Sequence, residues 1–243
     1  MSWKRSPRVR RAVLVVNPFG ASGASGSAGG NTYSHNRFGQ YVRNRTYPVN
    51  PKSTRQVAIR SIMSTLAQRW KDVLTAPYRA LWDLYAASVV MKNHLGVNIH
   101  LTGFQHYLRS NVARVQGGMA IVDVGPSVLS LPEKDSTIAV AFDVSDTEVE
   151  ITFNDTLVWA EQVGAGMLVL QGKPQNVTRG FFGGPWRWCG TILGVAAPGV
   201  ASPQNKTASW AMGAGQKSWI QCRISLADGR LSEPFQVSGS IVA

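Results

Sequence analysis

The sequence predicts an α+β protein in which a basic N-terminal arm and a helical hairpin or three-helix region precede an immunoglobulin- or fibronectin-III-like β-sandwich. Three observations support this fold class. Apolar residues recur at helical spacing between residues 54 and 115, short alternating runs fill residues 130–243, and cations are concentrated before residue 116. We expect an extended arm over 1–36, a β-hairpin plus helical docking module over 37–118, and the sandwich over 130–243.

The charge of the chain is divided unevenly along its length. Residues 1–115 contain 17 Lys and Arg against 2 acids, whereas residues 116–243 contain 8 against 11. Such asymmetry indicates a basic half that faces phosphates or an acidic protein surface. The apolar run from Ala12 to Val16 is too short for a signal sequence or a membrane span, so we expect synthesis in a cytoplasm and no membrane.

The expected arm combines a basic start with a Gly/Ser/Ala tract from Gly20 to Gly30. The run from Ala12 to Val16 is a possible strand. The tract itself cannot bury enough apolar surface to offset its ordering entropy. We therefore expect the arm to be either disordered or ordered by threading across neighbouring subunits.

Residues 37–49 alternate in part between apolar and basic side chains, as a hairpin strand or an extended clamp does. Pro48 and Pro51 then end the strand. Basic residues interleaved with aromatic ones suit a binding surface, which continues onto the next helix. The predicted partner-binding residues are Arg37, Tyr41, Arg43, Arg45, Tyr47, Arg55 and Arg60.

Two amphipathic helices are expected to form a hairpin after this segment. Ser53 or Thr54 can cap the first helix, and Thr75 with Pro77 can begin the second. The predicted inner stripes are Ile59, Ile62, Met63, Leu66, Trp70 and Val73 in the first helix, and Tyr78, Leu81, Trp82, Tyr85 and Val89 in the second. The residues predicted to form the centre of the helical core are Leu66, Trp70, Leu81 and Trp82.

A third helix is expected after a strand-like run from Val97 to Leu101. Thr102 is its predicted N-cap and Gly117-Gly118 its end. The side chains expected to face inward are Phe104, Tyr107, Leu108, Val112 and Val115.

Seven short strands separated by turn signals are typical of the sandwich. Their expected ranges are Thr137–Phe142, Glu148–Phe153, Leu157–Gln162, Met167–Gln171, Trp186–Val195, Ser218–Leu226 and Pro234–Val242.

Catalytic patterns are weak throughout the sequence. The run AVLVVNPFGASGASG has a strand followed by glycines but lacks the lysine and hydroxyl of a phosphate-binding loop. His100 and His106 lack cysteine or carboxylate neighbours at metal-ligand spacing, and Cys189 and Cys222 make neither a disulfide framework nor a zinc site. We therefore predict no enzyme, no cofactor and no metal.

Binding is the function that remains, and two kinds of partner fit. The basic and aromatic residues of RFGQYVRNRTY could grip a nucleic-acid backbone and stack on bases, which implies non-specific nucleic-acid contact. The same residues could instead pair with acidic patches on other proteins, with Tyr and Trp as anchors.

Several segments together resemble a known family. The segment SHNRFGQYVR is followed by PVNP, TRQ, RS, Trp70, LT, Arg79 and Trp82 over residues 32–86, and weaker likeness covers ILGV and IQCR through Asp228-Gly229. This pattern is similar to a family of tailed-phage and prophage structural proteins. The basic arm is longer here than the resemblance leads us to expect.

The resemblance implies a virion structural protein, made in the host cytoplasm and present in the particle in many copies or as a homo-oligomer. Its expected partners are the major capsid protein or other virion proteins. A capsid decoration (cement) protein is our first placement, and a neck, tail or fibre-base component is the alternative. A phage nucleic-acid-binding protein that uses the basic half is the alternative from another class.

Overall fold

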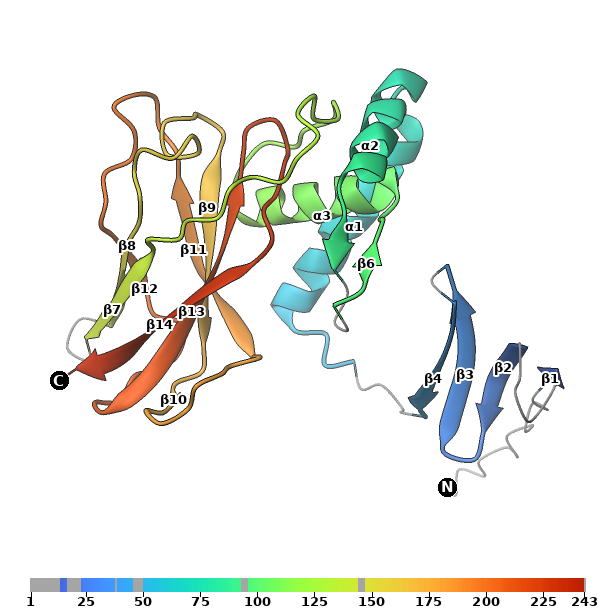
Figure 1. Ribbon diagram of the computed structural model, residues 1–243, viewed down its shortest axis with the longest axis horizontal. Helices are drawn as coiled ribbons and strands as arrows, with labels where there is room; N and C mark the ends of the chain where they lie inside the picture. The colour runs from blue at the N-terminus through green and yellow to red at the C-terminus, as the bar shows by residue number, and fades with distance from the viewer. Residues whose placement is uncertain are drawn as a thin grey trace, which may run out of the picture. The chain divides into compact units, whose positions relative to one another are not determined.

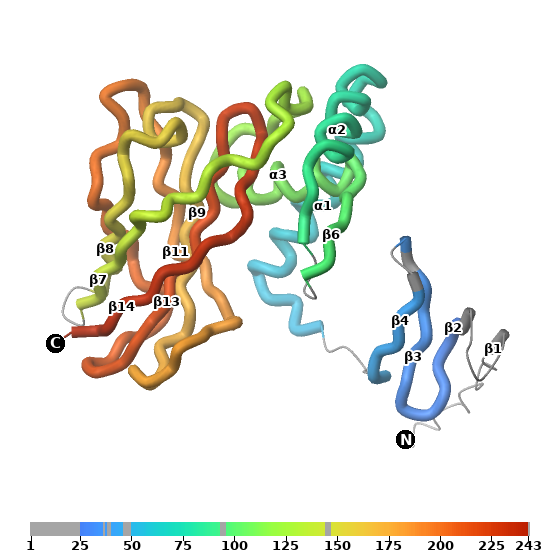
Figure 2. Tube along the Cα trace, in the orientation of Figure 1, coloured from blue at the N-terminus to red at the C-terminus, as the bar shows by residue number. Residues whose placement is uncertain are grey.

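The computed structural model describes residues 14–16, 23–37, 39–45, 50–92, 96–143 and 147–242. The chain divides into two units, residues 1–53 and residues 54–243. Their elements are drawn in Figure 1 and can be followed along the chain in Figure 2. The protein is α+β, as the sequence predicted, with three helices in its second unit.

The first unit contains a four-stranded antiparallel sheet in the order β1-β2-β3-β4. Its strands are β1 (Leu14–Val16), β2 (Gly23–Ala28), β3 (Asn31–Asn36) and β4 (Gly39–Asn44). Gly29 adopts a φ of 57° in the turn between β2 and β3, a conformation that glycine adopts without strain. The sheet is therefore a simple meander of neighbouring strands.

This sheet corrects our expectation for the Gly/Ser/Ala tract. Within the same chain, residues 23–25 pair with β1 and residues 26–28 with β3, and the Ser27 and Thr32 hydroxyls lie 2.9 Å apart across β2 and β3. Backbone hydrogen bonds need no apolar side chain, which is why a composition poor in apolar residues did not reveal the strand. Residues 1–13, 17–22 and 46–49 of the expected arm and clamp lie outside the described residues.

The helices are α1 (Thr54–Asp72), α2 (Ala76–Ser88) and α3 (Gly103–Gln116). Helix α3 begins with a capping box, in which the Thr102 hydroxyl accepts from the Gln105 amide and the Gln105 side chain accepts from the Thr102 amide. Thr75 precedes α2 as predicted, although its side chain makes no capping hydrogen bond. The short strands β5 (Met91–Lys92) and β6 (Asn98–Ile99) pair between α2 and α3.

The helical core is smaller than the predicted stripes. Its buried apolar residues are Leu66, Leu74, Trp82, Tyr85, Val89 and Tyr107. On α1, however, Met63 and Val73 are 45% and 54% exposed. Leu66 is the buried residue of α1, and α1 packs mainly against α3. None of the described helices could cross a membrane.

The β domain is built from β7 (Ala139–Asp143), β8 (Glu148–Thr152), β9 (Gly166–Gly172), β10 (Gln175–Asn176), β11 (Trp186–Leu193), β12 (Gln204–Thr207), β13 (Gln216–Ser225) and β14 (Phe235–Val242). The order of the sheet is β11-β9-β13-β14-β7-β8-β12, with β10 paired to β13. The end strands β11 and β12 lie close to each other, so the sheet is nearly closed into a barrel (Figure 1). Its apolar core includes Phe142, Ile151, Met167, Ile220 and Cys222.

One strand predicted in this domain was wrong, and strands β10 and β12 were not predicted. Residues 157–162 form turns instead of a strand, although Trp159 and Ala160 are buried. The Ala160 carbonyl accepts from the amides of Val195 and Val200, so apolar burial occurs here without strand pairing. Conversely, β12 has the polar sequence QNKT, which carries no apolar alternation to predict it.

Helix α3 joins the helices to the β domain. The Arg114 side chain is 2% exposed and donates to the Ser225 hydroxyl and to the carbonyls of Ala120, Gly164 and Leu226. These bonds connect the helices to the β domain inside the unit of residues 54–243. We expected a boundary between a helical module ending at 118 and a sandwich beginning at 130. The chain instead divides into its two units after Ser53.

Candidate binding surfaces

The β3–β4 hairpin brings three of the predicted binding residues together. Side chains two residues apart on a strand project to the same side, so Tyr41, Arg43 and, just past the strand, Arg45 lie along one face. All three are exposed, and Arg37 is exposed in the turn that joins the two strands. Tyr47 lies outside the described residues. The hairpin therefore presents cations beside an aromatic ring that is 39% exposed.

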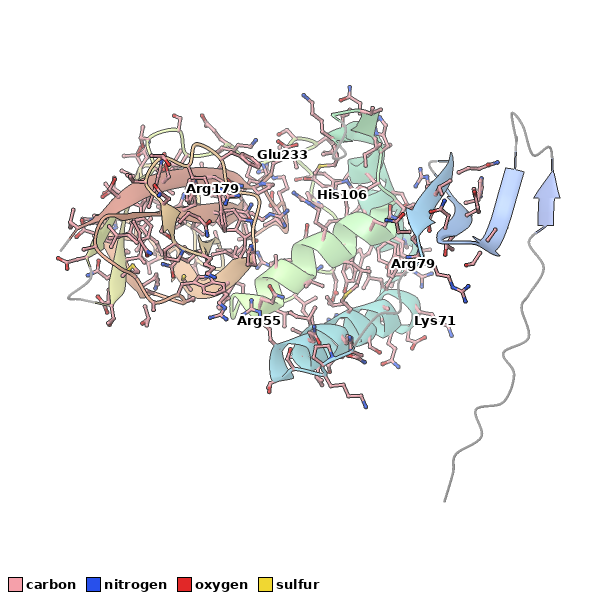
Figure 3. The ribbon with its side chains drawn as sticks, turned by 90° about the horizontal axis from the view of Figure 1, so that it is seen from below. Arg55, Lys71, Arg79, His106, Arg179 and Glu233 are labelled. Carbon is pink, nitrogen blue, oxygen red and sulfur yellow. The ribbon has the colours of Figure 1, made fainter. Side chains whose placement is uncertain are left out.

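The other two predicted binding residues belong to α1, in the second unit. Arg55 lies at the end of α1 nearest the β domain (Figure 3), where its guanidinium is 5.5 Å from the ring centre of Trp188 on β11. This cation–π contact ties α1 to the sheet. Arg60 is exposed one and a half turns later. The predicted set is therefore divided between two units, and Arg55 already has an intramolecular role.

The residues predicted as the helical core occupy its interior to different degrees. Leu66 and Trp82 are 1% and 0% exposed, whereas Trp70 and Leu81 are half-buried. The Trp82 indole donates to the Asp123 carbonyl at 2.9 Å. Trp70 packs at 5.3 Å from Tyr107, measured between ring centres. Trp82 is thus the central anchor, and Trp70 covers the edge of the same cluster.

Asp123 organises the polar side of this cluster. Its carboxylate accepts two hydrogen bonds from the Arg69 guanidinium, at 2.7 and 2.5 Å, and a third from the Tyr107 hydroxyl at 3.3 Å. The hydrogen bonds from Arg69 lower the pKa of Asp123, while burial raises the pKa of Tyr107. Sequence reasoning left residues 119–129 unassigned, yet this segment closes the helical core.

The buried titratable groups are poorly suited to proton transfer at neutral pH. Burial lowers the pKa of His106 to about 4 and raises the pKa of Tyr85 to about 12. Both cysteines are free, and burial raises the pKa of the Cys189 and Cys222 thiols. In the described part of the chain, no group of three or more His, Cys, Asp or Glu side chains could hold a metal ion.

Cations also lie beside aromatic rings on both sides of the sheet of the β domain, which the sequence analysis missed. Arg187 lies 3.5 Å from the ring centre of Trp210, and Lys217 lies 5.3 Å from that of Trp219. Trp219 in turn stacks on Phe182 at 5.3 Å. The arginine labelled Arg179 in Figure 3 also approaches Phe182, at 5.9 Å.

The signal for these cations was present in the sequence. Residues 162–227 contain six Lys and Arg and no acid, but averaging over 116–243 hid them behind acids that precede residue 162. Charges counted over shorter segments would have separated this basic stretch from the acids before it.

Comparison with known proteins places the chain in no family. No family model and no curated protein matches the sequence. Among solved structures, a family 76 glycoside hydrolase from a bovine Bacteroides thetaiotaomicron strain is 14% identical, with a TM-score of 0.30. The match covers 46% of this chain and 20% of the hydrolase chain. A likeness of that size supports no conclusion about fold or activity.

Proposed function

We propose that the chain is a structural protein of a bacteriophage particle, that it acts by binding other virion proteins, and that it is not an enzyme. The resemblance of the SHNRFGQYVR segment and the residues that follow it to a phage family is one basis for the proposal. The observation that carries it is the exposed sheet of the first unit.

That sheet lacks a buried core among the residues whose side chains are described. Within residues 25–35, 37 and 40–45, no side chain is buried. Sheets of a few strands generally need an apolar face packed against another element to be stable in water. Ordering entropy of about 1–2 kcal/mol per residue must be offset by contacts. A partner that covers one face would supply them, and Tyr41, which shares its face with Arg43, is an exposed anchor for it.

Within the particle, our first placement is a capsid decoration (cement) protein that binds the major capsid protein in many copies. The small basic sheet would attach to an acidic capsid surface, and the β domain would project. We further propose that the β domain is of the immunoglobulin or fibronectin-III type, supported by its seven-strand path over about one hundred residues. A neck, tail or fibre-base position uses the same contacts with a different partner.

Particle composition tests this proposal directly. Particles purified from a host that carries the gene are analysed by quantitative mass spectrometry, and we expect the chain in tens of copies or more. Its absence from purified particles would refute the virion assignment. Arg43→Glu with Tyr41→Ser should reduce incorporation without changing the stability of the second unit. Lys71→Glu, an exposed charge reversal on α1, is the matched control and should leave incorporation unchanged.

A nucleic-acid-binding protein is the second candidate, because Arg43, Arg45 and Tyr41 share one exposed face. Phosphate contacts make affinity fall steeply with salt. We would expect duplex or single-stranded DNA binding at low salt, lost in Arg43→Glu with Arg45→Glu. Failure of the full chain to bind DNA at low salt would eliminate this candidate and leave the particle assay unaffected.

A further inference from the structure

An open groove of about 360 Å³ lies where α1, α3 and β13 meet in the second unit. Met63 of α1 and Leu108 and Val112 of α3 provide apolar walls. Arg109 of α3 and Arg223 of β13 provide two guanidinium groups. The volume is near the lower end of the range for small-ligand sites, about 300–1,000 Å³. The groove therefore combines an apolar surface with two cations.

Arg223 enters this groove because of the strand on which it lies. Ile220, Cys222 and Ile224 of β13 point into the barrel core, so the alternating positions, including Arg223, face outward toward the helices. Burial lowers the pKa of Arg223. Among the described residues, no hydrogen bond, ion pair or cation–π contact satisfies its guanidinium.

The lack of a protein partner distinguishes the half-buried Arg223 from other arginines of this unit. Arg114 makes four hydrogen bonds, Arg69 pairs with Asp123, and Arg230 pairs with Asp228 at 2.7 Å. A guanidinium offers five N–H donors, and those of Arg223 are not among the buried unsatisfied atoms, so they are open to an acceptor that enters the groove.

Arg109 increases the positive potential of the groove. It donates to the carbonyls of Leu231 and Ser232 at 2.7 Å each, which fixes its position. Burial and the charge of Arg223 lower the pKa of Arg109 to about 10. Glu233 lies near enough to act in the opposite direction, but its carboxylate is paired with Lys134 at 2.8 Å.

We propose that this groove binds an apolar peptide segment of a virion partner through a carboxylate, which pairs with Arg223 beside Arg109 while the apolar part packs on Met63, Leu108 and Val112. Charge complementarity favours this occupant, because two guanidinium groups face an apolar surface and one of them has no acceptor. A bidentate guanidinium–carboxylate pair provides both attraction and orientation. The identity of the partner rests on the function proposed above, whereas the carboxylate site does not.

The chemical part of this inference is tested with hexanoate, a carboxylate on a five-carbon apolar body. The full chain is titrated while the side-chain Nε–H signals of arginine are followed by NMR. We expect saturable shifts of the Arg223 signal, and hexanamide should bind at least about tenfold more weakly because it lacks the charge. Absence of saturable shifts at Arg223, or equal binding of hexanamide, would overturn the site.

Arg223→Met separates a binding role from a structural one. Replacing a half-buried charge that has no protein partner with an apolar side chain should leave the melting temperature unchanged or raise it, while hexanoate binding falls at least about tenfold. If Arg223 had a structural role, its substitution would instead lower the melting temperature of the protein. Arg187→Met removes a cation that contacts Trp210 outside the groove and should leave hexanoate binding unchanged.

The source of the carboxylate is tested on particles. Arg223→Met should lower the copy number of the chain in purified particles while Arg187→Met should not. Hexanoate binding at Arg223 together with normal incorporation of Arg223→Met would refute a virion peptide as the occupant. If the wild-type chain were absent from particles, the proposed function would fail, but the hexanoate titration would still decide whether the carboxylate site exists.

Discussion

His106 should make the second unit less stable in mild acid. Its ring is 0% exposed, packs edge-on against Tyr85 at 5.1 Å between ring centres, and has no hydrogen-bond partner for either nitrogen among the described residues. Burial, with a smaller contribution from the Arg109 charge, lowers its pKa from 6.5 to about 4. Between these two values the unfolded chain binds a proton that the folded chain does not, so stability falls as pH falls.

The size of the effect follows from that difference in pKa. With 6.5 in the unfolded state and about 4 in the folded state, the free energy of unfolding should be about 2–3 kcal/mol lower at pH 4.5 than at pH 7. For a unit of this size, that corresponds to a melting temperature lower by about 5–10 °C. The loss begins below pH 6.5 and is complete below about pH 4.

Urea unfolding at a series of pH values measures this dependence, and a neutral variant isolates it. In His106→Leu, or His106→Gln if the first variant folds poorly, the loss between pH 7 and 4.5 should be smaller by about 2–3 kcal/mol. His100→Leu, at an exposed position, is the control and should behave as the wild type. If a His106 variant retains the full pH dependence, the reasoning about its burial is refuted.

Three further predictions concern the stability of the same unit. Arg114→Met should cost about 3–5 kcal/mol of unfolding free energy in urea titrations, because it strands buried acceptors; an unchanged midpoint would contradict this. Trp82→Ala should cost about 4–5 kcal/mol and Trp70→Ala about 3 kcal/mol, since the former is fully buried and the latter half-buried; the reverse order by thermal unfolding would be inconsistent with the packing. Asp123→Asn should lower the free energy of unfolding at neutral pH. The wild type should lose the same contribution only as pH falls below 3.8, because the hydrogen bonds from Arg69 lower the pKa of Asp123. Identical acid unfolding curves of the two proteins below pH 4 would argue against the Arg69–Asp123 pair.

Local sequence signals predicted the helices well. Thr102 and Gly117 mark the ends of α3, and α1 begins at Thr54, directly after Ser53. These features depend on residues within one turn of each other, so spacing alone reveals them. The exposed Met63 shows the limit of such reasoning, because an apolar stripe does not tell which of its turns another element will cover.

Features that depend on distant residues were not predictable in the same way. Arg114 and Arg223 are both arginines in otherwise ordinary segments. Arg114 is satisfied by four acceptors, three of which are 50 or more residues away along the chain, whereas Arg223 has none among the described residues. Strand β12 is polar because it closes the sheet at its end, where pairing with β8 is made by backbone groups. Of the predicted binding residues, the structure brings together those of the hairpin. They share a face because alternate side chains of a strand project to the same side.

The attachment of α3 to the β domain has a consequence for how the protein responds to its surroundings. Every acceptor that Arg114 reaches is a neutral carbonyl or hydroxyl, so acid protonates none of them. Salt screens such bonds less than it screens a pair of exposed charges, because the guanidinium is buried. Acid should therefore loosen the interior of the helical cluster, through His106 and Asp123, before it detaches α3 from the barrel. The end of α3 that Arg114 fixes to the barrel should therefore keep its contacts at a lower pH than the end that carries His106.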